Sequence, residues 1–434
     1  MRLPRPNSSN KVAPSAPATS PLKPDDSAIL ALDIGTEFVK AIIARENPKS
    51  GELEIIGVGR SRQASSNMFD GAIADIPGVV SVCERALTAA ESMAGLTAKT
   101  TVVGIAGELI KGNTSTIRYR RKNGNKPLSE QEMALIIERV QDRAGEQARA
   151  EVAAETNNPN VEVRLINSAI VSLHIDGYKI SNPIGFKGSD VAIQFYTAFA
   201  PLVHVSAIEK VCAELNLELL AVAVEPFAVC RACLGDDLDS NFSGIVMDIG
   251  GGTTDVAVVD DGGVEGTKMF SIGGRSFTHQ VAEGLGVDFD AAEKYKLALE
   301  NPDQLDANIR EKVAKSVHRN LAVWLSGIEI TLEEFELAEM LPSRILLCGG
   351  GAGLLELQEA LATTNWYADL PFSRRPIVHL VEPDEIPGII NTTEAQLDHS
   401  FITALGLLRV ALDTLGGAEQ GTGLRAKLAK LLQN

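Results

Sequence analysis

The sequence of 434 residues is poor in aromatic side chains and in cysteine. Phe, Trp and Tyr together make up 5% of it, and there are five cysteines. Only Cys230 and Cys233 have the spacing of a C-x-x-C pair, and no second pair completes a metal site. The sequence therefore predicts buried free thiols in a reducing compartment, and neither a disulfide framework nor a zinc or redox site.

Long apolar runs and an excess of positive charge are also missing. No apolar stretch reaches the roughly 18 residues of a membrane span, and the N-terminus has no apolar core of the kind found in signal peptides. The net charge of -17 argues against a general nucleic-acid binder, because such proteins gather Lys and Arg against the phosphates. The length suffices for at least two domains, each with its own core.

The stretch Gly244–Val259, GIVMDIGGGTTDVAVV, has the pattern of a β-hairpin with a polar tip. Its turn consists of Gly250, Gly251, Gly252, Thr253 and Thr254. Glycine lets backbone N–H groups approach an anion, threonine adds hydroxyl donors, and Asp248 could hold Mg²⁺ through water. The pattern predicts a phosphate-binding loop, although a glycine-rich hairpin without this role has the same composition.

A second copy of this pattern lies near the start of the chain. Ala28–Ala44 again has a strand, Asp-Ile-Gly, Thr and a strand, with Asp33 in the place of Asp248 and with Gly35 and Thr36 in the turn. A third glycine cluster follows another apolar run at Gly349, Gly350 and Gly351. It is neither a P-loop, since no Gly-Lys-Ser/Thr follows, nor a dinucleotide fingerprint. The chain is therefore predicted to be internally duplicated.

The three motifs in this order resemble those of the actin-like ATPase superfamily, which includes DnaK-type chaperones and sugar kinases. The resemblance implies an α/β fold of two duplicated ribonuclease-H-like halves around a nucleotide cleft, with ATP and Mg²⁺ as ligands. Carried over, it assigns Asp33 and Asp248 to the metal through water. It assigns contacts with the nucleotide to Asp33, Gly35, Thr36, Asp248, Gly250–Thr254 and Gly349–Gly351, the last group facing the adenosine.

Three more residues have both a functional and an ordinary interpretation. Glu225, in a Glu-Pro pair, resembles the superfamily's carboxylate that orients water near the γ-phosphate or the metal, and it is equally suited to begin a helix. Glu293 and Lys296, in an Ala-Glu-x-x-Lys sequence, resemble ribose or base contacts, and they are equally an i,i+3 surface pair. No unambiguous general base is present, so the sequence leaves ATP hydrolysis open.

Residues 99–190 interrupt the first half of the duplication. Ser129 and Glu132 form a capping box that opens a long helix, and strand-like runs follow it, which predicts a small α+β subdomain. The turn Asn182–Gly188 is similar to one in the bacterial FtsA family, and Val102–Lys111 resembles the start of that family's inserted SHS2-type (1C) subdomain. The basic run Ile117–Lys126 is predicted to be a solvated hairpin, with a contact site as the alternative.

The expected domains follow from these motifs and from composition. They are a disordered tail at 1–26, a first half (1A) at 27–98 and 191–243, the insertion at 99–190, a second half (2A) at 244–285 and 341–411, a helical 2B lobe at 286–340, a flexible linker at 412–423 and a terminal helix at 424–434. The FtsA family normally has a strand-bearing lobe at the 2B position. This lobe is therefore predicted to be reduced and almost wholly helical, with Ala307–Leu325 and Glu329–Glu339 as its clearest helical runs.

The last eleven residues have the pattern of a short, basic, amphipathic helix on a tether. The residues expected to meet a membrane are Leu424, Arg425, Lys427, Leu428, Lys430, Leu431 and Leu432. The pattern predicts weak, reversible binding to anionic lipid, with packing against the body as the alternative. The FtsA family ends in such a helix.

Taken together, the motifs resemble the FtsA family most. The resemblance implies an ATP-binding protein that forms polymers on the cytoplasmic face of the membrane at the division site. It also implies binding to FtsZ, contacts of the insertion with late division proteins, and no nucleic-acid partner. A PilM-like scaffold of type IV pilus assembly shares the core and the insertion, but is not expected to end in a basic helix. A sugar-kinase-like phosphotransferase has no reason to carry the insertion.

Overall fold

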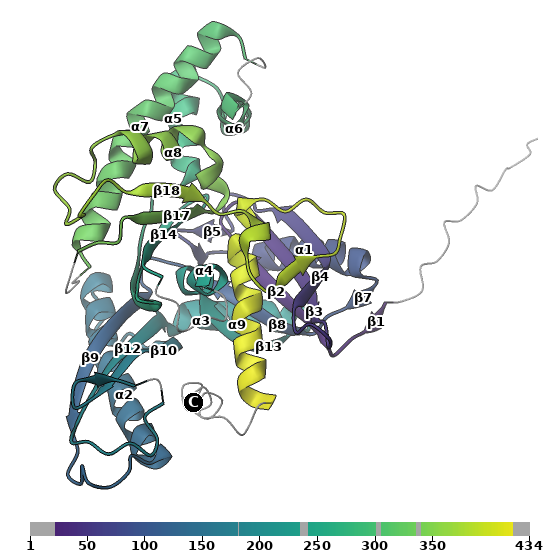
Figure 1. Ribbon diagram of the computed structural model, residues 1–434. Helices are drawn as coiled ribbons and strands as arrows, with labels where there is room; N and C mark the ends of the chain where they lie inside the picture. The colour runs from purple at the N-terminus through teal and green to yellow at the C-terminus, as the bar shows by residue number, and fades with distance from the viewer. Residues whose placement is uncertain (1–21, 181, 235–241, 301–304, 336–339, 420–434) are drawn as a thin grey trace, which may run out of the picture.

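The computed structural model describes residues 22–180, 182–234, 242–300, 305–335 and 340–419 (Figure 1). Two sheets form its scaffold, with helices packed against them. The apolar runs that flank the two aspartate motifs form β2 (Ala28–Ile34) and β14 (Gly244–Ile249), and every residue of both strands is buried. These strands lie in the middle of their sheets, which explains their continuous apolar character.

The first sheet has the strand order β13-β8-β2-β3-β4-β19. β2, β3 and β4 are antiparallel, whereas β8 and β13 run parallel to β2. The helices α1 and α9 pack against this sheet. The bounds are β3 Phe38–Glu46, β4 Leu53–Arg62, β8 Thr100–Ile105, β13 Glu218–Val224, β19 Ile389–Asn391, α1 Ile76–Ala94 and α9 Ile402–Glu419.

The second half repeats this arrangement in the order β16-β15-β14-β17-β18. Again three antiparallel strands are followed by two that run parallel to the first, so the predicted duplication is confirmed. The helix α4 (Glu225–Leu234) packs on α9 between the two sheets. The remaining bounds are β15 Thr254–Asp260, β16 Gly263–Phe270, β17 Arg344–Cys348, β18 Ile377–Leu380, α5 Gly274–Leu285 and α8 Leu355–Thr363.

The inserted α+β unit consists of one long helix on an antiparallel sheet. Ser129 caps the helix by accepting a hydrogen bond from the N–H of Glu132. Of the three strand-like runs expected after this helix, the first two form one strand, β10, which contains register shifts, and the third lies in β12. The basic run is the end of β9 and the loop after it, and because β9 pairs with β12, it is not a hairpin of its own. The bounds are β9 Lys111–Arg120, α2 Glu130–Thr156, β10 Val163–Ile175, β11 Tyr178–Lys179, β12 Asp190–Pro201 and α3 Leu202–Glu214.

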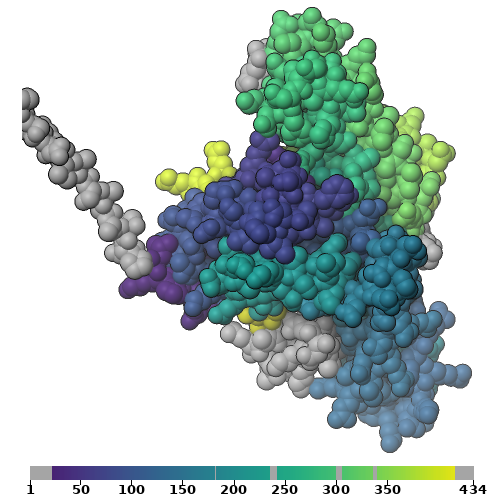
Figure 2. All heavy atoms as spheres, turned by 180° about the vertical axis from the view of Figure 1, so that it is seen from behind, coloured from purple at the N-terminus to yellow at the C-terminus, as the bar shows by residue number. Residues whose placement is uncertain are grey.

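The described residues between 286 and 340 are helical, as expected for a reduced lobe. They contain α6 (Phe289–Leu297) and α7 (Ala307–Glu333). The break expected between the runs 307–325 and 329–339 is absent, because α7 is continuous across it; residues 336–339 lie outside the described residues. Trp324 of α7 is fully buried beside Phe277 of α5 in the core of this half. Figure 2 shows the green lobe projecting beyond the purple and blue first half.

Both ends of the described chain are more ordered than expected. Lys23 and Pro24 of the predicted tail form β1, which pairs with β7 (Leu96–Thr97). The predicted linker is partly wrong, because α9 continues through Gly416 to Glu419 despite the poor helix propensity of glycine. The predicted terminal helix at 424–434 lies outside the described residues. Among the described helices, none is long and apolar enough to cross a membrane.

The five cysteines are free thiols, as predicted. Cys83, Cys212, Cys230 and Cys348 are buried, and Cys233 is half-buried. Burial raises the pKa of the Cys83 thiol to about 12, which keeps it protonated and unreactive.

Candidate functional site

The first aspartate loop ends in a buried ion pair. Asp33, near the end of β2, is 2% exposed, and its Oδ2 accepts a hydrogen bond of 2.7 Å from Nζ of Lys40. The two residues are direct cross-strand partners in the β2–β3 ladder. Burial alone would lower the pKa of Lys40, but the adjacent Asp33 carboxylate raises it above its ordinary value. The lysine therefore stays charged and neutralises Asp33.

The second aspartate loop has an acid where the first has the lysine. Asp248 of β14 faces Asp255 of β15 across the ladder. Burial, reinforced by the Asp248 charge, raises the pKa of Asp255 to about 8, although Thr253 Oγ1 donates a hydrogen bond of 3.1 Å to it. Burial also raises the pKa of Asp248, while a hydrogen bond of 2.5 Å from Thr403 Oγ1 partly opposes the shift. At neutral pH Asp255 therefore holds a proton beside Asp248.

Glycines let the two loops touch. A Cβ on Gly251 would lie 2.9 Å from Cβ of Glu37, and one on Gly252 would lie 3.1 Å from Cγ2 of Thr36. Side chains at these positions would push the halves apart. Both loops line one cavity, as the resemblance implies. The predicted residues that line it are Asp33, Gly35, Thr36, Glu225, Asp248, Gly250, Gly251, Thr253, Gly349 and Gly350.

Three predicted loop residues do not line this cavity. Gly252 packs against Thr36. Thr254 is buried, donates a hydrogen bond of 2.7 Å to the carbonyl of Ile272 and accepts one of 3.0 Å from Trp324. Gly351 packs against the side chain of Ile249. Their positions fit a role in shaping the loops.

The third glycine cluster closes the cavity behind Asp248. Gly349 has a φ of 84°, which disfavours any other residue, and a Cβ there would lie 2.1 Å from Oδ1 of Asp248. The carbonyl of Gly349 also contacts Nδ1 of His399 at 2.8 Å. Only glycine can bring this backbone against the aspartate.

Glu225 begins α4, is half-buried and lines the cavity. Burial, and then the Asp33 charge, raise the pKa of Glu225 well above its ordinary value. A Cβ on Gly104 of β8 would lie 3.0 Å from the Glu225 side chain, so this glycine makes room for the carboxyl group. Burial and the neighbouring carboxylates thus favour the neutral form of the Glu225 carboxyl group, which can orient a water molecule.

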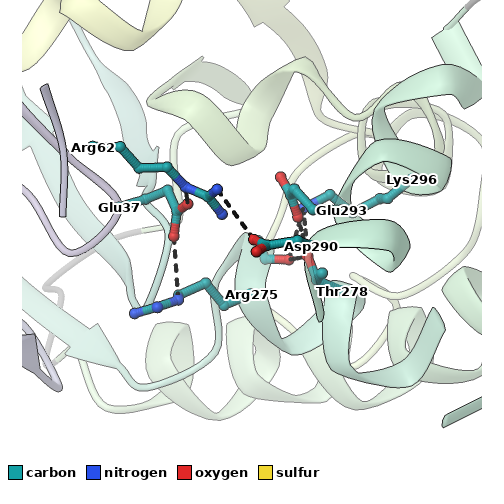
Figure 3. Close-up of polar contacts among 8 residues, drawn as sticks. Glu37, Arg62, Arg275, Thr278, Asp290, Glu293 and Lys296 are labelled. Atoms are coloured by element: carbon teal, nitrogen blue, oxygen red, sulfur yellow. Dashed lines mark hydrogen bonds and ion pairs between the residues drawn. The ribbon is translucent and has the colours of Figure 1, made fainter. Parts of the chain in front are cut away.

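Glu293 and Lys296 do not line the cavity. Figure 3 shows both on α6, turned toward Thr278 of α5. Lys296 Nζ lies 2.9 Å from Glu293 Oε2, 2.8 Å from Thr278 Oγ1 and 3.0 Å from the carbonyl of Gly274. Glu293 also accepts a hydrogen bond from Thr278. In this structure the pair therefore fastens α6 to α5.

Sequence analysis missed Lys40, Asp255, Thr403 and Glu37, which all line the cavity. Lys40 and Asp255 could have been found, because each lies seven residues after its aspartate and faces it across a tight hairpin. Thr403 gave no local signal, since it comes from α9, 155 residues away from Asp248. The described residues contain no group of three or more His, Cys, Asp or Glu side chains arranged to hold a metal ion.

Comparison with known proteins agrees with this geometry. A family model described as "Cell division protein FtsA" matches residues 245–408. The cell division protein FtsA of Neisseria meningitidis serogroup B is 26% identical, covering 94% of this chain and 98% of that protein. The FtsA of Pseudomonas aeruginosa is also 26% identical, covering 81% of this chain and 85% of that protein.

The fold resembles that of a solved chain from a PilM–PilN type IV pilus biogenesis complex. The TM-score is 0.62 at 18% identity, with 90% of this chain and 98% of that chain covered. This likeness supports the actin-like architecture, while the sequence relatives over nearly the whole chain point to one branch of it. The chain is similar to FtsA cell division proteins over nearly its whole length and has the actin-like ATPase fold.

Proposed function

We propose that this chain is an ATP-binding division protein that polymerises on the cytoplasmic face of the membrane and tethers FtsZ there. The main support is the cavity shared by two duplicated aspartate loops, which suits a ligand that bridges both halves. Bound ATP would favour the closed arrangement of the halves and thereby polymerisation. The family relationship supports the role in division.

The residues around the cavity fit a magnesium nucleotide. Four carboxyl groups, those of Asp33, Glu225, Asp248 and Asp255, share it with Lys40, the cation bound to Asp33. Such an excess of carboxyl groups, three of them buried, favours a divalent cation, held through water by Asp33 and Asp248. The N–H groups of Gly250–Thr253 and Lys40 would face phosphate, and Gly349–Gly351 the adenosine. Mg²⁺ would neutralise phosphate charge, and Glu225 would orient a water molecule.

The other partners follow from segments outside the cavity. We assign binding of anionic lipid to residues 424–434, since leucines and cations alternate there in the pattern of an interfacial helix. Each cation contributes about 1 kcal/mol near such a surface, so a single helix binds weakly and polymers supply the avidity. The insertion at 99–190 would contact late division proteins. No nucleic-acid partner is proposed.

Electron microscopy on anionic lipid monolayers tests this function. With ATP and Mg²⁺, filaments are expected on the lipid, and added FtsZ should be recruited to them. Deletion of residues 424–434 should release the protein from anionic liposomes in sedimentation, whereas the same liposomes should retain the full chain. Equal sedimentation of both would contradict the anchor, and absence of ATP-dependent filaments would contradict the polymer.

A PilM-like pilus scaffold is the alternative, because the solved chain of the PilM–PilN complex is covered almost completely. A cytoplasmic scaffold of that kind would recognise a partner's peptide and would not need lipid. FtsZ in the monolayer experiment separates the two. Recruitment of FtsZ supports the division role. A chain that forms no filaments and binds neither the lipid nor FtsZ supports the scaffold.

A further inference from the structure

Glu37 faces cations from both halves of the molecule. It lies in the turn between β2 and β3, and Figure 3 shows its carboxylate between Arg62 and Arg275. Arg62 Nε lies 2.7 Å from Oε1, and Arg275 Nε lies 3.2 Å from Oε2. Arg62 belongs to β4 of the first half, whereas Arg275 belongs to α5 of the second. The carboxylate therefore joins the halves by charge.

The pair of Glu37 and Arg275 is the more shielded of two ionic contacts across the cleft. Their side chains are 16% and 18% exposed. In the outer contact, Arg62 Nη1 lies 3.1 Å from Asp290 Oδ1, but these side chains are 47% and 72% exposed. Salt and solvent weaken exposed pairs much more than shielded ones. The inner pair therefore contributes most of the attraction.

The pair is built directly onto the two phosphate loops. The N–H of Arg275 donates a hydrogen bond of 2.8 Å to the carbonyl of Gly251, so the arginine is fixed to the second loop. Glu37 is part of the first loop, and its carbonyl accepts a hydrogen bond of 2.9 Å from the N–H of Gln63. Separating the side chains therefore means separating the loops.

Arg275 is the partner of the Glu37 carboxylate from the second half, while Arg62 holds its other oxygen from the first half. Oε2 of Glu37 is a buried oxygen that accepts no hydrogen bond, so Arg275 interacts with it through charge alone. Loss of Arg275 would leave Arg62 on Oε1 but no cation on the buried Oε2, which favours opening of the loops toward water.

We propose that Glu37 and Arg275 are positioning residues that hold the phosphate loops together and thereby slow the release of a bound nucleoside triphosphate. This inference rests on the proposed nucleotide site. The ligand contacts both loops and leaves only when they part, and parting the loops breaks this ion pair. The strength of the pair then sets part of the barrier to release.

Stopped-flow release of a fluorescent ATP analogue from the full chain tests the proposal. Glu37→Gln and Arg275→Gln should each accelerate release about tenfold, the change expected for loss of roughly 1.4 kcal/mol. The double variant should be no faster than the single ones, because both remove the same interaction. Arg164→Gln is the matched control, since it breaks an exposed pair with Glu209 away from the cleft and should leave release unchanged.

The sign of the Glu37→Gln effect separates this role from simple repulsion of phosphate. If Glu37 only repelled the ligand, removal of its charge would slow release, and that result would overturn the proposal. Rates within twofold of the parent protein, or effects of the two substitutions that multiply in the double variant, would overturn it as well.

A measurement without nucleotide keeps the proposal testable if the parent chain fails to bind the analogue. Spin labels at the exposed positions Glu84 of α1 and Lys315 of α7 report the distance between the halves. Arg275→Gln should broaden and lengthen the distance distribution in the free chain. Failure of the parent to bind ATP refutes the proposed function, whereas an unchanged distribution refutes the role of the pair.

Discussion

The two aspartate hairpins have the same backbone arrangement but differ in the charge of the residue that faces the aspartate. In both, the aspartate near the end of the first strand faces a residue of the second strand across the ladder. That residue is Lys40 in the first half and Asp255 in the second. Strand order and loop position are the same, so one exchanged side chain turns an ion pair into a pair of acids.

This difference gives the first hairpin a structural role and makes the second hairpin depend on a ligand. The first hairpin is neutralised from within, because Lys40 stays charged beside Asp33. The second has no such cation, and a proton held by Asp255 relieves the repulsion. The second hairpin is thus the half that gains most from an incoming cation such as Mg²⁺. Four substitutions test this comparison.

The largest effect on ligand binding is expected for Asp248→Ala. Removal of this carboxylate takes away the proposed water-mediated metal contact in the half that lacks its own cation. Affinity for ATP in the presence of Mg²⁺ should fall by about 100-fold or more, as for lost groups around a metal. Isothermal titration calorimetry measures it, and retained affinity would refute the assigned role.

Lys40→Met should destabilise the fold by about 3–5 kcal/mol, because it leaves the Asp33 charge buried without a partner. Urea unfolding in the absence of nucleotide measures the change. The variant Asp33→Asn/Lys40→Met removes both charges and should recover much of the loss. If the single and double variants were equally unstable, the ion pair would not be the cause.

Asp255→Asn should change the pH dependence of stability. The pKa of Asp255 rises from 3.8 when unfolded to about 8 when folded, so its stabilising contribution is complete below pH 4 and is lost as pH rises through 8. At pH 8 in EDTA the variant should be more stable than the parent by about 2 kcal/mol, allowing for the charge shared with Asp248. Thermal unfolding from pH 5 to 9 measures this, and parallel curves would contradict it.

Thr403→Val is expected to have the smallest effect. It removes the hydrogen bond to Asp248 and leaves a similar volume, at a cost of about 1 kcal/mol. The same unfolding experiment measures it. Thr414→Val is a suitable control on the same helix, because its hydroxyl bonds only to the carbonyl of Val410.

Much of this architecture could be predicted from local patterns. The two hairpins follow from buried apolar runs around an Asp-Ile-Gly turn, and the capping box located the start of α2 correctly. Patterns of this kind are local in the chain. The sequence could not place Thr403 against Asp248 or show that Glu293 and Lys296 bind Thr278, because these contacts depend on how separate helices pack.

Helix ends were harder to predict than helices. The single helix α7 was expected as two, and α9 was expected to end where the predicted linker begins, at residue 412. In both cases the expected break rested on local composition. Buried residues such as Trp324 in α7 and Leu408 in α9 fix these helices to the sheets, and tertiary packing overrides weak local preferences.

The insertion is connected to both halves of the molecule. Its chain enters from β8 of the first sheet, yet β9 pairs with β16 of the second, and Tyr196 contacts Thr267 at 3.1 Å across the seam. Any rotation between the halves must therefore move the insertion relative to at least one of these two connections. The insertion extends well away from the aspartate loops (Figure 1). A small rotation of the halves at these loops therefore becomes a larger displacement at the far end of the insertion, where a neighbouring molecule could bind.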